Sequence, residues 1–192
     1  MAPPYSISEV NSLSDGEFKS TFGNVIELYA DAAASVKDKR PFGSVIAICE
    51  AFQTYLEQLN IEDKLIVLKL HPDLAGKLAA RGELTRESSE EQKAAGLDHL
   101  TSEQKSIMDQ RNQQYKKKFG FPFIICAKEN KIQSILDGLQ TRYNNSYEKE
   151  VNTGINEVKK ICRLRILNLF EIGYSTKKLN NNWIKITVWN SK

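Results

Sequence analysis

One of only two histidines in this 192-residue chain stands where its side chain could transfer a proton. His71 ends the apolar segment 62–70, which has a helical pattern, and Pro72 fixes the backbone directly after it. Because an imidazole has an unperturbed pKa of about 6.5, His71 is a candidate general acid or base near neutral pH. A structural explanation is also open, since the carboxylate of Asp73 could bind the ring or cap the next helix.

Three polar side chains share one face of an expected helix in the stretch "TRESSEEQ" at 85–92. With Thr85 as the N-cap, Ser88, Glu91 and Gln92 stand at i, i+3 and i+4, whereas Glu90 points elsewhere. That face would offer a hydroxyl, a carboxylate and an amide to a ligand. The alternative is that these residues only stabilise the helix start, because Ser-x-x-Glu is also a capping box and the helix macrodipole favours glutamate there.

A third candidate is Arg165, which lies on the apolar face of a long helix expected at about 147–170. By the 3.6-residue period it falls about 40° from the centre of the apolar stripe, whereas Arg163 falls about 120° away, towards solvent. A guanidinium on a core-facing stripe needs an anionic partner, because burying it unpaired is very costly. Either a protein carboxylate or an anionic ligand could be that partner. The stripe consists of Val151, Ile155, Val158, Cys162 and Leu169.

The segment "FPFIICA" at 121–127 is expected to be extended, because Pro122 disfavours helix in the residue before it. It could be only an apolar filler of the core. Alternatively, backbone outside a helix has free N–H and C=O groups that can hydrogen-bond a flat polar ligand. The other histidine, His99, is expected in a turn at the surface. The common nucleotide-binding, zinc-protease and serine-hydrolase motifs are missing from the sequence.

The elements that must position these groups are mainly helices. Two capping boxes, Ser6 with Glu9 and Ser14 with Glu17, predict the first two helix starts. The clearest core signal is a helical stripe of apolar residues at 44–59. The other helices are expected at 24–39, 62–70, 86–95, 102–119 (capped by Thr101 and ended by Gly120), 130–143 and about 147–170.

The pattern as a whole predicts an all-α protein, with one compact multi-helix domain over residues 1–170. The tail at 171–192 is different, because apolar and polar residues alternate between Trp183 and Trp189. Such alternation is typical of a short strand or an extended segment. The sequence suggests no role for this tail.

Composition excludes several classes of protein. The 27 basic residues are scattered among 24 acidic ones, so the chain lacks the basic face of a nucleic-acid-binding protein. Its longest apolar runs are far shorter than the roughly 20 residues that a membrane span needs. The cysteines Cys49, Cys126 and Cys162 are too dispersed for a metal site or a disulfide framework. We therefore expect buried thiols, no metal and no membrane association.

Several motifs in one order resemble the 2-oxo-4-hydroxy-4-carboxy-5-ureidoimidazoline (OHCU) decarboxylases of urate degradation. They are "FGNVIE", "RPF", "HPDLAG", "ESSEEQKAAGL", "FGFPFIICAK" and "EVKKICRLR", and together they span about residues 10–170. Each motif is weak alone, but the set in register is specific. The resemblance implies a carboxy-lyase that converts OHCU to (S)-allantoin and CO2, in an all-helical homodimer without a metal or organic cofactor.

The resemblance also implies roles for single residues. His71 matches the family's proton donor, Glu91 its catalytic glutamate and Arg165 its active-site arginine. The positions that bind the substrate correspond to Pro72, Ser88 and Gln92, and to the backbone of Phe123, Ile124, Ile125, Cys126 and Ala127.

Two features depart from the family pattern. Arg86 stands where many members have proline, which removes a residue that favours the first helical position but does not change the ligand-facing side. The tail has no recognised counterpart, and it stops at Ser191-Lys192 without the final leucine of a peroxisomal tripeptide. The resemblance suggests a peroxisomal location, and a cytoplasmic one is equally compatible with this ending.

A second function belongs to another class: a helical binding or scaffold protein that keeps the fold without catalysis. The two functions differ in one structural requirement. An enzyme needs the candidate residues to meet in one cavity, whereas a scaffold has no need to bring together His71, Ser88, Glu91, Gln92 and Arg165.

Overall fold

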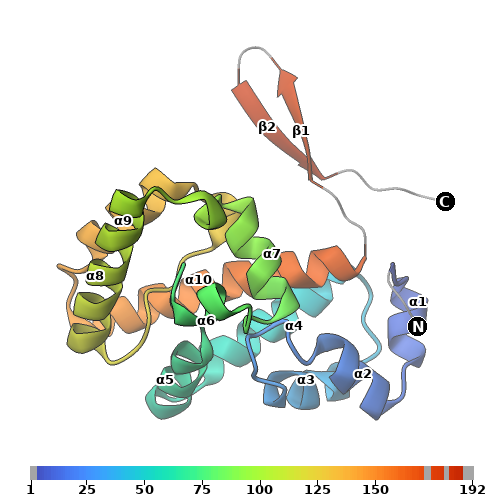
Figure 1. Cartoon of the computed structure of the whole chain (residues 1–192). Helices are drawn as coiled ribbons and strands as arrows, with labels where there is room; N and C mark the ends of the chain where they lie inside the picture. The colour runs from blue at the N-terminus through green and yellow to red at the C-terminus, as the bar shows by residue number, and fades with distance from the viewer. Residues whose placement is uncertain (1–3, 171–173, 180–181, 188–192) are drawn as a thin grey trace.

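The structure of the chain, a computed structural model, describes residues 4–170, 174–179 and 182–187. Helices fill most of the first range, and the other two form an antiparallel hairpin, in agreement with the predicted all-α class and strand-like tail. The helices in Figure 1 are α1 Ile7–Ser12, α2 Asp15–Phe22, α3 Asp31–Val36, α4 Val45–Gln58, α5 Ile61–Leu70, α6 Lys77–Arg81, α7 Arg86–Ala94, α8 Ser102–Phe119, α9 Ile132–Arg142 and α10 Tyr147–Leu169.

Side-chain caps account for most helix starts. Ser6 and Ser14 each accept a hydrogen bond from the backbone N–H three residues on, as both predicted capping boxes require. Thr101 caps α8 in the same way, and Gly120 ends it in the left-handed conformation that glycine favours. These boundaries confirm the predictions. The short helix α6 was not predicted.

The long helix α10 crosses the helical part of the molecule (Figure 1) and packs against α4 and α5. The predicted apolar stripe of α10 is buried, with Leu169 only partly covered. In α4 the buried face includes Ile48, Phe52 and Leu56, as the sequence predicts. None of the described helices is long and apolar enough to cross a membrane.

A glycine sets how closely α5 approaches α10. A Cβ atom added at Gly154 of α10 would lie 2.8 Å from Cδ2 of Leu68 in α5. At that distance the side chain of Leu68 would have to move to admit a Cβ at position 154, so the glycine allows this close contact between the two helices. Because His71 follows α5 directly, the packing of α5 on α10 also helps to place the histidine.

The helix predicted at 24–39 is wrong for residues 24–30. Asn24 accepts a hydrogen bond from the backbone N–H of Leu28 through Oδ1 at 2.9 Å, and Leu28 adopts a positive φ of 51°. A side-chain bond of this kind replaces the helical backbone bond. Helix α3 therefore begins only at Asp31, and the preceding loop turns the side chain of Glu27 into the interior.

The tail contains two short strands, β1 Tyr174–Leu179 and β2 Asn182–Thr187. They pair antiparallel, with Tyr174 opposite Thr187 and Leu179 opposite Asn182. The second strand coincides with the predicted alternating segment up to Thr187, and residues 188–192 lie outside the described ranges. The first strand was not predicted.

Candidate active site

One pocket gathers nearly all the predicted site residues. It lies between the end of α5, the buried face of α7, helix α10 and the extended segment 121–127. Of the eleven residues predicted, only Cys126 is not part of its wall, and Leu74 and Ile161 are additions. The pocket is lined by His71, Pro72, Leu74, Ser88, Glu91, Gln92, Phe123, Ile124, Ile125, Ala127, Ile161 and Arg165.

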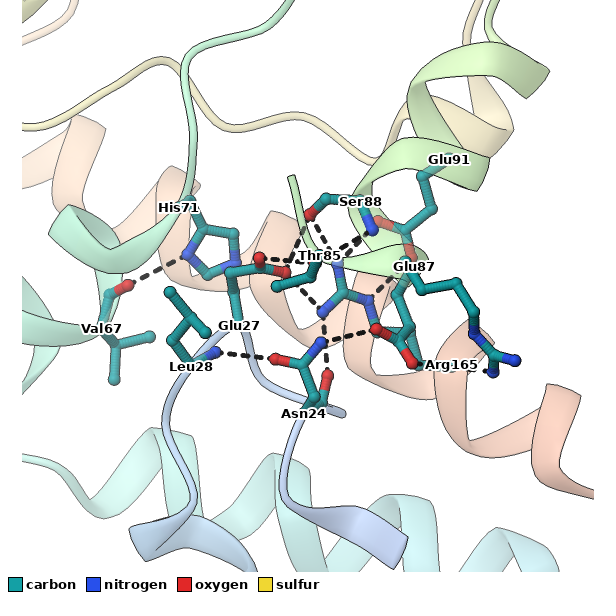
Figure 2. Close-up of polar contacts among 11 residues, drawn as sticks. Asn24, Glu27, Leu28, Val67, His71, Thr85, Glu87, Ser88, Glu91 and Arg165 are labelled. Atoms are coloured by element: carbon teal, nitrogen blue, oxygen red, sulfur yellow. Dashed lines mark hydrogen bonds and ion pairs between the residues drawn. The ribbon is translucent and has the colours of Figure 1, made fainter. Parts of the chain in front are cut away.

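His71 is the C-cap residue of α5 and is buried, with 8% of its surface exposed. Its Nδ1 lies 3.0 Å from the carbonyl oxygen of Val67 (Figure 2). A carbonyl oxygen can only accept, so Nδ1 carries the proton and the neutral ring presents a bare Nε2. This Nε2 is buried and has no hydrogen-bond partner among the described residues. Asp73 does not bind the ring; its carboxylate pairs with Lys116 at 2.8 Å.

The surroundings of His71 keep its ring neutral near pH 7. Burial lowers its pKa to about 4, because an imidazolium loses its hydration in the core. The carbonyl of Val67 and the charge of Glu27 act in the opposite direction, and the charge of Arg165 adds to the lowering. At neutral pH the ring is therefore ready to accept a proton at Nε2.

This neutral histidine predicts a loss of stability in acid. In the unfolded chain an imidazole takes up a proton near pH 6.5, whereas in the fold His71 does so only near pH 4. Between these values protonation favours the unfolded chain, so we expect this group to lower the free energy of unfolding by on the order of 3 kcal/mol as pH falls. Urea titrations at several pH values check this, with His71→Asn as the control. Equal pH dependence in both proteins would contradict the assignment.

Arg165 forms the centre of a buried polar cluster, shown in Figure 2. Its Nε and Nη2 bind both carboxylate oxygens of Glu91, each at 2.8 Å. Its Nη1 binds the Asn24 carbonyl oxygen at 2.9 Å and lies 2.7 Å from Oε2 of Glu27. A further bond of 3.2 Å joins Nη2 to the hydroxyl of Ser88. The guanidinium thus makes four hydrogen bonds and an ion pair with Glu27, and protein carboxylates supply its anionic partners.

The two carboxylates keep Arg165 charged in the core. Burial alone would lower the pKa of Arg165, but its hydrogen bonds and ion pairs with Glu91 and Glu27 raise it above its ordinary value. Figure 2 shows the guanidinium held between α7 and the loop that precedes α3. The arrangement fixes both the charge and the orientation of the arginine at the pocket wall.

Glu27 is the member of this cluster that the sequence reasoning missed. It is 1% exposed and accepts hydrogen bonds from the hydroxyls of Thr85 and Ser88, both at 2.8 Å. Residues 24–39 were predicted to form one helix, and no feature of that helical pattern marks Glu27 as buried. The only signal was its place in "FGNVIE", one of the motifs that carry the family resemblance.

The polar face of α7 is as predicted. Ser88, Glu91 and Gln92 are buried, Glu90 is exposed, and Thr85 caps the helix by accepting from the N–H of Ser88. Thr85, not Ser88, is the N-cap, and Ser88 and Glu91 bind Glu27 and Arg165, so the capping-box interpretation of Ser88 and Glu91 is wrong. Ser88, Glu91 and Gln92 are part of the pocket wall, and contact with a ligand stays a prediction.

Gln92 also holds the strained loop after His71. Ala75 has a positive φ of 51°, a conformation that a residue with a Cβ rarely adopts. Three bonds of 2.9 Å restrain this turn: Ala75 N–H donates to Gln92, Lys105 donates to the Ala75 carbonyl, and Asn112 donates to the Leu74 carbonyl. The loop is thus fixed from α7 and α8, and Pro72 and Leu74 keep their places in the pocket.

The extended segment 121–127 is anchored from the side away from the pocket. The N–H of Cys126 donates to Glu157 at 2.8 Å, and Arg142 donates to the carbonyl of Ile124 at 2.8 Å. Arg142 is itself paired with the buried Glu150. Both backbone groups of Cys126 are bound within the protein, and this residue is not part of the pocket wall. The N–H groups of Ile125 and Ala127 bind no other described residue.

The remaining candidates occupy ordinary structural positions. His99 is exposed in a short 3₁₀ turn, Leu97–His99, as predicted. The three cysteines are free and buried. Among the described residues, no group of three His, Cys, Asp or Glu side chains is placed to hold a metal ion.

Comparison with known sequences gives a consistent result. A family model described as OHCU decarboxylase matches residues 11–167. The chain is 43% identical over 164 residues to the 2-oxo-4-hydroxy-4-carboxy-5-ureidoimidazoline decarboxylase of Xenopus laevis, covering 85% of this chain and 94% of that protein. A protein of the same name from Amia calva is 40% identical over 171 residues, covering 89% of this chain and 98% of its own length.

Solved structures agree with the fold. An OHCU decarboxylase determined in the presence of (S)-allantoin superposes with a TM-score of 0.63 at 28% identity, covering 82% of this chain and 99% of that one. An (S)-allantoin synthase superposes with a TM-score of 0.71 at 21% identity. The match covers 90% of this chain and 56% of that one. At that identity the second structure supports the fold alone.

Proposed function

The chain belongs to the OHCU decarboxylase family, and from this premise we propose that it converts OHCU to (S)-allantoin and CO2, as a carboxy-lyase of urate degradation. The observation that carries the proposal is the convergence of His71, Ser88, Glu91, Gln92 and Arg165 on one pocket. A scaffold protein would have no need for a bare, buried imidazole nitrogen facing a cavity.

The substrate can supply its own electron sink. In OHCU one ring carbon carries a hydroxyl and a carboxylate, and the neighbouring carbon carries the ureido group and belongs to the ring C=N bond. The carbon–carboxylate bond breaks, CO2 leaves, and the electron pair moves into the C=N system, whose nitrogen takes one proton from solvent. The hydroxyl then loses its proton and becomes a carbonyl, while the ureido carbon gains one. No electron-sink cofactor is required for this balance.

His71 is suited to carry the proton from oxygen to carbon. Its bare Nε2 would first take the proton of the substrate hydroxyl and would then deliver it to the ureido carbon. The bond from Nδ1–H to the Val67 carbonyl holds the ring in one orientation. Delivery from one fixed side makes a single enantiomer, so His71 acts in this proposal as the proton donor of the product-forming step.

Glu91 and Arg165 would bind and orient the substrate. Because both oxygens of Glu91 are bound to Arg165, we assign the carboxylate to accepting a substrate N–H or O–H with its remaining lone pairs. Arg165 would reach a substrate oxygen by exchanging one of its present bonds. The bond to Ser88, at 3.2 Å the longest of its hydrogen bonds, is the one that we expect to exchange.

The extended wall would recognise the flat edge of the ring and its ureido group. The unbound N–H groups of Ile125 and Ala127 are donors for substrate oxygens, and the Gln92 amide is a further polar contact. Phe123, Ile124 and Pro72 would cover the faces of the ring. For Cys126 we propose a supporting role, since its backbone groups hold the wall in place.

The assembly and cellular location of the protein are further proposals that come from the family resemblance. We propose a homodimer in a peroxisome or in the cytoplasm, built from the 1–170 domain, with the 171–192 tail as an appendage. Sedimentation velocity of the purified protein measures the assembly, and a monomer at micromolar concentration would contradict it.

The proposed reaction is tested by adding freshly generated OHCU and following allantoin by circular dichroism. We expect consumption of OHCU far above its spontaneous rate and formation of the S enantiomer alone, because the protein delivers the proton to one face. Spontaneous decay in buffer provides the blank. Racemic allantoin at the spontaneous rate would refute the proposal and favour a binding or scaffold protein.

A further inference from the structure

Glu27 is buried beside the pocket and is not one of the residues that line it. Its Oε2 lies 2.7 Å from Nη1 of Arg165, and its carboxylate accepts bonds of 2.8 Å from the hydroxyls of Ser88 and Thr85. Of these three partners, Arg165 and Ser88 are also part of the pocket wall. Glu27 therefore reaches a bound substrate only through other residues.

The cluster contains one more negative charge than positive charge. Glu91 alone would neutralise Arg165, with two parallel bonds of 2.8 Å. Glu27 adds a second carboxylate to the same guanidinium. The two hydroxyls stabilise this carboxylate but do not neutralise it. A buried charge in excess of its partner is costly, and a neighbouring group that gains a positive charge would offset this cost.

The group that faces this charge is His71. Figure 2 shows the Glu27 carboxylate between the His71 ring and the Arg165 guanidinium. The charge of Glu27 favours a proton on the ring, and the charge of Arg165 disfavours it. Glu91 of α7 is bound to Arg165, and the thiol of Cys126 in the extended wall stays neutral because burial raises its pKa to about 12. Glu27 is thus the negative group of this cluster that favours protonation of the ring.

We propose that Glu27 is a positioning residue of the decarboxylation, which holds Arg165 and Ser88 at the pocket wall and supplies the negative charge that stabilises a proton on His71 during the reaction. The inference rests on the proposed function. In that cycle the ring of His71 becomes an imidazolium between its two proton transfers, and burial disfavours this state. The excess carboxylate offsets that cost at the moment when the proton is on the ring.

Glu27→Gln tests the proposal, because glutamine keeps the size and an acceptor oxygen but removes the charge. We expect kcat for OHCU at neutral pH to fall about tenfold or more, and KM to change less than about threefold, since Glu27 is not part of the pocket wall. In a plot of kcat against pH, the limb on the acid side should move to lower pH by about one unit, because His71 then holds its proton less strongly. The variant leaves a balanced pair of Glu91 and Arg165, so it should fold.

Two variants control the experiment. Glu87→Gln removes a partly buried carboxylate of α7 that binds Asn24 at 2.8 Å and is not part of the pocket, and it should keep the kcat profile of the wild type. Glu27→Asp keeps the charge but shortens its reach, so its kcat and acid limb should lie between those of the wild type and the glutamine variant. If the glutamine variant does not fold, the aspartate variant carries the same comparison.

Unchanged kcat and an unmoved acid limb in Glu27→Gln would overturn the proposal. A higher KM or a lower melting temperature with unchanged kcat would also overturn it, because that result is expected of a purely structural residue. Failure of the wild type to turn over OHCU is a different result, visible before the variants are compared, and it would refute the proposed function itself.

Discussion

Replacing His71 with asparagine is expected to lower OHCU turnover by about 10²–10⁴-fold while leaving the helical fold intact, because general acid–base groups typically contribute that much. Asparagine is the right replacement, since its amide can still donate to the carbonyl that Nδ1 now binds. It cannot, however, accept a proton and pass it on. The variant should therefore bind substrate and release almost no product above the spontaneous rate.

The measurement is kcat for freshly generated OHCU, together with the helical circular dichroism signal as a check of the fold. His99→Asn is the matched control, because it changes the exposed histidine and should keep full activity. A folded His71→Asn enzyme with more than about a tenth of wild-type turnover would show that another group carries the proton.

The second large effect is expected for Arg165→Met, which removes the cation between two buried carboxylates. The side chains of Arg165 and Glu27 are only 3% and 1% exposed, so solvent cannot take over the role of the guanidinium. Breaking a buried ion pair by removing one partner costs about 3–5 kcal/mol, and here two carboxylates lose the same partner. We expect a destabilisation of at least that size, together with loss of activity.

Urea unfolding measures the loss of stability, and Arg163→Met is the control on the same helix. Removing the two charges left behind should restore much of the stability but none of the activity, as in the triple variant Arg165→Met, Glu27→Gln, Glu91→Gln. If Arg165→Met were as stable as the wild type, the cluster would not hold the elements together in the way that its bonds indicate.

Much of the site could be predicted because it depends on local patterns. The helical period places Ser88, Glu91 and Gln92 on one face whatever the rest of the fold does. The amphipathic stripe of α10 marks Arg165 as buried, and Pro122 explains why the segment at 121–127 leaves the helix. Family resemblance then supplied the roles that these patterns leave open.

The parts of the site that could not be predicted depend on contacts between segments that are distant in the sequence. Arg165 binds the carbonyl of Asn24, 141 residues away, and no local pattern reports such a contact. The loop at 24–30 has a sequence compatible with a helix, but the side chain of Asn24 competes for the backbone and turns Glu27 inwards. Whether the partner of Arg165 is a protein carboxylate or a ligand could likewise be decided only from the three-dimensional structure.

The close approach of α5 and α10 at Gly154 has a consequence for redesign of the enzyme. His71, the proposed proton carrier, stands at the end of one of these helices, and Arg165 belongs to the other. Their separation therefore depends on how α5 packs against α10 in the core, and Leu68 against Gly154 is one of the contacts between these helices. Enlarging the pocket for a bulkier substrate need not begin at the pocket wall, since the spacing of these two helices can be altered from the interior, away from every residue that would touch the ligand.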